Sequence, residues 1–168
     1  MCTVKFAKIT LLVVNILVLG VFLLGKQMTP IPGTSSGNGN PAILIAWFLI
    51  PVLIFVVILW VRIFRANSIS TTFFIISIFG ILVHLTVAFF YQKNELNEYR
   101  QVIKNALINR DGVADAEYIQ SITSGLSIHV NNQYFNINTY FMFVTFSIFV
   151  AIVYTLWGLW EKKEKRRK

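Results

Sequence analysis

The chain has 168 residues, of which 56% are hydrophobic and only 13% are charged, and its formal net charge is +8. This composition excludes an ordinary soluble domain, in which about 25% of residues are charged. Positive charge is also found in nucleic-acid-binding proteins, but here six of the 15 basic residues lie in the last seven positions, shortly after an apolar run. Such a cluster is typical of the flank of a membrane helix, so we expect no nucleic acid as a partner.

A short N-terminal segment, residues 1–8, precedes the first apolar run, which is predicted to be a membrane helix over residues 9–25. A bilayer core of about 30 Å requires roughly 20 apolar residues in a helix. Lys5 and Lys8 also fit a signal peptide, but the end of the run lacks the small residues that cleavage requires, so we expect an uncleaved helix. Cys2 is the only cysteine, and no intrachain disulfide is therefore predicted.

Two further membrane helices are predicted over residues 42–61 and 71–91. The segment 26–41 before them is rich in Pro, Gly, Ser and Asn, which predicts a flexible outer loop. The turn at residues 62–70 is short, so the two helices that it joins are expected to pack as antiparallel neighbours.

The segment 92–138 has soluble-like character and is predicted to form a small α+β cap. Its first part places apolar side chains at helical spacing, and a second short helix is expected after an Arg-Asp-Gly turn. The residues LSIHVNNQYFNI then alternate between apolar and polar side chains, as two β-strands would. Because Asn131 and Asn132 tolerate the positive φ angles of a type I′ turn, we predict a β-hairpin in which Ile128 faces Phe135.

The fourth membrane helix is predicted over residues 139–160 and is followed by a polybasic tail, residues 161–168. If the N-terminus is cytoplasmic, ten basic residues lie in inside segments and five in outside segments. The positive-inside rule therefore predicts that both termini are cytoplasmic. The tail residues expected to set this topology and to attract anionic lipid headgroups are Lys162, Lys163, Lys165, Arg166, Arg167 and Lys168.

The predicted fold class is thus an all-α membrane protein, a four-transmembrane-helix bundle with a small α+β extracytoplasmic cap between helices 3 and 4. The frequent use of Ile, Phe, Asn and Lys and the lack of an Asn-x-Ser/Thr sequon favour a multi-pass protein in the plasma membrane of a bacterium.

Three residues near the middle of the predicted spans form a candidate midplane polar site, namely Asn15, Pro51 and His84. Polar and ionisable side chains at this depth are often functional, and proline leaves a backbone carbonyl without its usual helical partner. The alternative is that Asn15 and neutral His84 are hydrogen-bond contacts between helices and that Pro51 kinks its helix. We favour the alternative, because no Asp, Glu, Lys or Arg lies in any span.

Motifs for catalysis are not found, since the sequence has neither HExxH nor CxxC. Asp111, Asp115 and Glu117 surround a turn and a helix start, where acids cap backbone N–H groups. His129 lacks further metal ligands, because the only other histidine is in a span. We therefore expect no enzyme activity, no cofactor and no metal.

The function predicted by this elimination is that of an accessory, regulatory, assembly or immunity-type protein, which acts by contact with a membrane protein partner or with a second copy of itself. The cap supplies the surface, because an isolated hairpin is marginal in water and its apolar face must be covered. The alternative is a subunit of a small oligomeric transporter or channel with Asn15 and His84 in its path. The predicted partner surface consists of Leu96, Tyr99, Ile103, Ile128, Tyr134 and Phe135.

Overall fold

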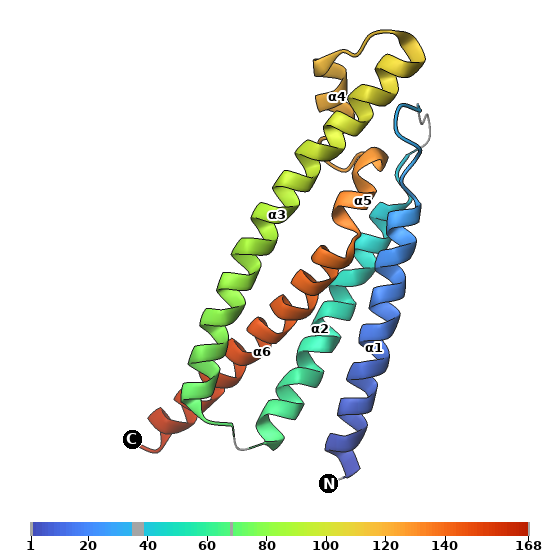
Figure 1. Cartoon of the computed structure of the whole chain (residues 1–168). Coiled ribbons are helices and arrows are strands. Elements are labelled where there is room, and N and C mark those ends of the chain that lie inside the picture. Colours follow the sequence, from blue (N-terminus) through green and yellow to red (C-terminus); the bar gives the residue numbers. More distant parts are fainter. Residues whose placement is uncertain (1, 35–38, 68, 168) are drawn as a thin grey trace. The chain divides into compact units, whose positions relative to one another are not determined.

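The computed structural model describes residues 2–34, 39–67 and 69–167 and is built of helices joined by short loops (Figure 1). The four long helices are α1 (Cys2–Gln27), α2 (Ala42–Ala66), α3 (Thr71–Asp111) and α6 (Ile137–Lys165). Between α3 and α6 lie the short helices α4 (Ala116–Ile122) and α5 (Asn131–Tyr134) and the 3₁₀ helix η1 (Ile128–Val130). Part of the predicted loop 26–41 and the last residue of the predicted tail lie outside the described residues.

The four long helices are each long and apolar enough to cross a membrane. They contain the predicted spans 9–25, 42–61, 71–91 and 139–160. Apolar runs of this length form helices because lipid offers the backbone no hydrogen-bond partner, so each N–H and C=O must be paired within the segment. The prediction of an all-α, membrane-type fold with four such helices is therefore confirmed.

The third predicted span and the first predicted cap helix form one uninterrupted helix, α3, of 41 residues. At about 1.5 Å per residue, α3 is roughly 60 Å long, twice the thickness of a bilayer core of about 30 Å. Neither glycine nor proline occurs between Gly80 and Gly112, so the backbone has no reason to break there. Gly112, with a φ of 77°, ends the helix in the left-handed region that suits glycine.

The predicted α+β cap is wrong, because the described residues of segment 92–138 include no strand. Ile128 belongs to η1, and the two asparagines belong to α5, so Ile128 and Phe135 are not partners across a hairpin. Asn131 has a φ of −58° and a ψ of −37°, which is right-handed helical and not the positive φ of a type I′ turn. A hairpin turn would expose Asn131, whereas its side chain is fully buried and hydrogen-bonded here. An apolar alternation this short does not distinguish strands from helical turns.

The second predicted cap helix is confirmed as α4, which turns back beside the end of α3 (Figure 1). Asp115 caps α4 by accepting a hydrogen bond from the N–H of Glu117 at 2.9 Å. Ile103 and Leu107 of α3 and Ile119 of α4 are buried together, so an apolar contact fixes the short helix that its own seven residues would not stabilise.

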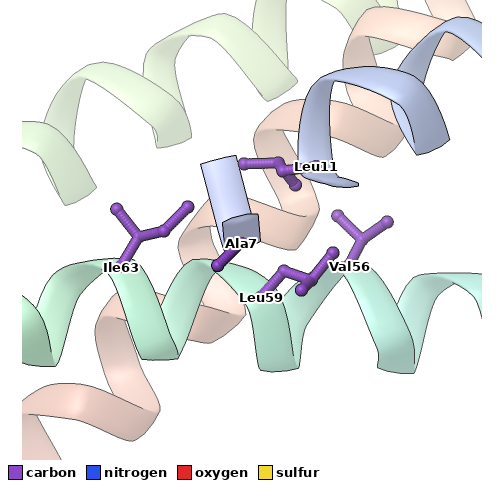
Figure 2. Close-up of a cluster of buried hydrophobic side chains, with 5 residues drawn as sticks. All are labelled: Ala7, Leu11, Val56, Leu59 and Ile63. Carbon is purple, nitrogen blue, oxygen red and sulfur yellow. The ribbon is translucent and has the colours of Figure 1, made fainter. Parts of the chain in front are cut away.

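The chain divides into two compact units, each with its own core. Unit 1 comprises residues 1–18, 49–87 and 141–168, and unit 2 comprises residues 19–48 and 88–140. In unit 1 the buried side chains that point toward one another between α1 and α2 (Figure 2) are Ala7, Leu11, Val56, Leu59 and Ile63. Neighbours on each helix are three or four positions apart and so share one face. Van der Waals packing of this kind holds membrane helices together, because lipid chains are as apolar as the side chains.

Candidate functional site

The three residues of the predicted midplane polar site lie in unit 1, each on a different helix. His84 on α3 is half-buried, and its Nδ1 lies 3.3 Å from the hydroxyl oxygen of Thr145 on α6. Asn15 on α1 donates from Nδ2 to the carbonyl oxygen of Leu11 at 2.8 Å, within its own helix. Pro51 lies inside α2 and is exposed. His84 therefore links two helices, whereas the bond that Asn15 makes to Leu11 is local.

His84 borders a hollow of about 430 Å³ that is lined by residues of α2, α3 and α6. Its wall is mostly apolar, and the polar side chains on it include Ser77, His84 and Thr145. Asn15 and Pro51 do not line this hollow. A proton or solute path requires a succession of polar groups. The midplane site stays a prediction, and His84 with Thr145 is the pair on which a test of it would act.

In unit 2, a reciprocal pair of asparagine amides joins the start of α2 to the start of α5. Asn40 donates from Nδ2 to Oδ1 of Asn131 at 2.7 Å, and Asn131 donates from Nδ2 to Oδ1 of Asn40 at 3.0 Å. Asn40 also donates to the carbonyl oxygen of Leu126 at 3.0 Å and accepts from the N–H of Ala42 at 3.0 Å. One side chain thus caps α2 and holds the segment that carries η1 and α5.

A second amide cluster surrounds Gln92 of α3. Gln92 donates from Nε2 to Oε1 of Gln133 on α5 at 2.8 Å. Its own Oε1 accepts from Nδ2 of Asn136 and from Nδ2 of Asn138, each at 3.1 Å. Asn138, near the start of α6, also donates to the carbonyl oxygen of Ala88 at 3.0 Å. Neutral hydrogen bonds therefore join α3, α5 and α6 just beyond the predicted end of the third span.

Sequence reasoning missed this amide network, which consists of Asn40, Gln92, Asn131, Gln133, Asn136 and Asn138. Amide groups both donate and accept but do not titrate near neutral pH, so the network positions chain segments and supplies no acid or base. The available signal was the density of Asn and Gln over residues 131–138, at the edge of an apolar run. Buried amides are costly unless they are paired, which is why such a density indicates a mutual cluster.

Two of the six residues predicted as a partner surface lie in the core of unit 2. Ile103 and Phe135 are 0% and 5% exposed, and the Phe135 ring packs edge-on against Phe22 of α1 at a centroid distance of 5.8 Å. Leu96 and Tyr99 on α3 are half-buried, and Tyr99 packs against the cluster that contains Ile103. Of the predicted set, Tyr134 is exposed and Ile128 is half-buried, so these two stay candidates for a partner surface.

Three neighbouring residues form an apolar surface that we call the cap patch: Leu126, Ile128 and Tyr134. Leu126 is 64% exposed and Tyr134 is 45% exposed, while Ile128 is half-buried. The Tyr134 hydroxyl donates to the carbonyl oxygen of Gly125 at 2.6 Å, which ties this side chain to the residue directly before Leu126. Gly125 has a φ of 57°, a left-handed conformation that glycine adopts without strain.

Burial lowers the pKa of His129, whose side chain is 5% exposed in η1. The imidazole therefore favours its neutral form more than a solvated histidine does. Among the residues that the structure describes, no group of three or more His, Cys, Asp or Glu side chains is placed to hold a metal ion. His129 is best explained as a buried structural residue of unit 2.

The segment from Gly33 to Gly37 reads Gly-Thr-Ser-Ser-Gly and so matches the letters of the GxSxG nucleophile motif. That motif requires a strand before the serine and a helix directly after it. Gly33 follows α1 and not a strand, and Ser35 lies outside the described residues. The match therefore carries no catalytic assignment.

The predicted tail begins within the last turns of α6. Its described basic residues, all of them exposed, are Lys162, Lys163, Lys165, Arg166 and Arg167, while Lys168 lies outside the described part of the chain. Cations at a helix C-terminus interact favourably with the helix dipole, so this placement is stabilising before any lipid is considered.

Comparisons of the chain with protein-family models, with curated proteins and with solved structures give no match.

Proposed function

We propose that this chain is a non-enzymatic accessory protein of the membrane, of an assembly, regulatory or immunity type, which binds another membrane protein through the cap patch. The observation that supports the proposal is the exposure of Leu126 and Tyr134, at 64% and 45%, on a segment held in place by buried amides. An apolar surface that is both exposed and rigid favours a protein partner, since a patch of this kind costs solubility unless it is covered.

The amide network supports the proposal by fixing the shape of the patch. Asn40 holds the carbonyl of Leu126, and Tyr134 is held through Gly125, so binding would not have to order a mobile loop. A surface ordered in advance binds more tightly for the same contact area. Tyrosine is also enriched at the energetic centre of protein interfaces, where its ring packs and its hydroxyl stays bonded.

The proposed setting is the plasma membrane of a bacterium, with both termini in the cytoplasm and the cap outside. The supporting observation is the distribution of basic residues, ten of which fall on the cytoplasmic side in this orientation. The tail residues 162–168 then meet anionic headgroups of the cytoplasmic leaflet, and the cap patch meets a partner on the outer side.

Site-specific photocrosslinking in intact membranes tests the proposal. A crosslinking amino acid at position 126 or 134 is expected to capture a partner protein in defined stoichiometry, and Leu126→Asp is expected to abolish its co-purification. Val113→Asp is the matched control, because Val113 is 74% exposed but lies in the turn between α3 and α4. Equal loss with both variants, or capture of lipid alone at positions 126 and 134, would overturn the proposal.

A transporter or channel subunit is the competing proposal, and its supporting observation is the polar contact between His84 of α3 and Thr145 of α6. If His84 lies on a transport path, His84→Ala abolishes flux or shifts its pH dependence in reconstituted vesicles. If the contact only packs α3 against α6, the variant changes thermal stability and leaves both partner capture and vesicle permeability as they were.

A further inference from the structure

A groove of about 650 Å³ lies between α2 and α6 in unit 1. Binding sites for small molecules have volumes of about 300–1,000 Å³ and are mostly apolar with a few placed polar groups. The groove has this character, because its wall is apolar except for Tyr154 and two arginines, Arg62 and Arg65. Neither arginine belongs to the polybasic tail, and both are among the ten basic residues counted on the cytoplasmic side.

The groove has an apolar end and a cationic end. Residues four apart on each helix line it in rows, which are Leu53, Val57, Val61 and Arg65 on α2 and Phe146, Val150 and Tyr154 on α6. The guanidinium carbon of Arg65 lies 5.3 Å from the centroid of the Tyr154 ring. Because the last member of each row meets the last member of the other, the helices run in the same direction along the groove, and both rows end at the arginines.

The arginines at this end carry charge that the groove itself does not balance. No Asp or Glu lines the groove beside Arg62 and Arg65. Within the described ranges of the chain, the one ion pair joins Arg110 to Asp111, which belong to unit 2. Both arginine side chains are exposed, so an anionic group at this end of the groove can reach both guanidinium groups.

A second hollow, of about 470 Å³, shares Arg65 and extends the positive charge. Lys162 and Lys165 line it together with a single acid, Glu161. The Glu161 carboxylate already accepts a hydrogen bond from the Trp157 indole at 3.0 Å. The cationic end of the groove therefore has room and charge for a headgroup larger than a single ion.

We propose that this groove binds one anionic phospholipid, with an acyl chain between α2 and α6 and the phosphate at Arg62 and Arg65. Leu53 and Arg65 are twelve positions apart, a rise of about 18 Å, which is close to the roughly 15 Å thickness of one leaflet of the bilayer core. Arginine suits the phosphate because its planar fork makes two parallel hydrogen bonds to neighbouring oxygens. Length, apolar wall and terminal charge together match a lipid better than a soluble anion, which would leave the apolar rows unfilled.

Native mass spectrometry of the full-length protein in mild detergent tests the proposal by titration with phosphatidylglycerol and with phosphatidylcholine of the same chain length. We expect preferential binding of one phosphatidylglycerol. The double variant Arg62→Gln, Arg65→Gln should weaken that binding about 30-fold, from the ordinary contribution of two basic residues near a lipid surface. The matched control is Arg166→Gln, Arg167→Gln, which removes the same charge from the exposed tail and should leave the bound lipid in place.

A second variant tests the apolar part of the site without changing charge. Val150→Trp fills the groove between the two rows and is expected to displace the acyl chain, so that retention of phosphatidylglycerol falls by a similar factor. If the two double arginine variants weaken phosphatidylglycerol binding equally, the interaction is general charge attraction, and the proposed site is refuted. Equal binding of the two lipids, or full retention by Val150→Trp, would overturn it as well, and if Val150→Trp does not fold, the arginine comparison decides alone.

Discussion

Replacing Asn131 with alanine removes the side chain on which the position of α5 and η1 depends. The amide is 0% exposed and makes a reciprocal pair with Asn40, through hydrogen bonds of 2.7 and 3.0 Å. Each bond contributes about 1 kcal/mol, and the loss of a longer hydrogen bond from Asn131 to the carbonyl oxygen of Met28, at 3.5 Å, adds up to about 1 kcal/mol more. We therefore expect the free energy that opens this part of unit 2 to fall by about 2–3 kcal/mol.

Hydrogen–deuterium exchange of the detergent-solubilised protein measures this loss directly. Amides of residues 126–136 should exchange about 30- to 150-fold faster in Asn131→Ala, while amides of unit 1 should be unchanged. Asn132→Ala is the matched control, because Asn132 is the next residue and its side-chain oxygen has no hydrogen-bond partner among the described residues. If both variants accelerate exchange equally, the amide pair does not hold the cap, and the reasoning is refuted.

Three further predictions concern unit 2. Gly25→Ala should destabilise the protein by about 1–3 kcal/mol in thermal unfolding, because the new Cβ would lie 2.5 Å from the Phe135 ring. The control is Gly20→Ala, whose new Cβ meets nothing within 4 Å and which should be neutral or stabilising. The free energy of unfolding should fall as the pH decreases below about 6.5, because burial lowers the pKa of His129 and the unfolded chain then binds the proton more readily. His129→Gln should flatten that pH dependence, and an unchanged profile would contradict the role given to His129. Gln92→Leu should lower the unfolding temperature by about 4–8 °C, since it breaks three hydrogen bonds and removes the donor to the side-chain oxygen of the buried Gln133. A change below about 1 °C would show that the cluster contributes little.

The composition and the four apolar runs were sufficient to predict the helices and their number. Helix formation in such runs follows from the lack of hydrogen-bond partners in lipid, which is a local requirement and therefore readable from consecutive residues. The short helix α4 was also predictable, since the acid at Asp115 and the helical spacing around Ile119 are local signals. The hairpin prediction failed because its signal was an alternation over a few residues, and the decisive contact was made from Asn40, 91 residues away in the sequence.

The residues of the candidate site also fall into those that local sequence predicts and those that it does not. The exposed Tyr134 was identified from its place in the cap, but Ile103 and Phe135 were grouped with it because apolar letters do not reveal which side of a helix another helix covers. The amide network and the pairing of Arg65 with Tyr154 were not predictable, because both join segments that are distant in the chain. The sequence by itself determined that the chain forms four membrane-type helices, because that depends on the solvent around each segment. Only the tertiary structure decided which polar groups meet, because that depends on how the helices pack.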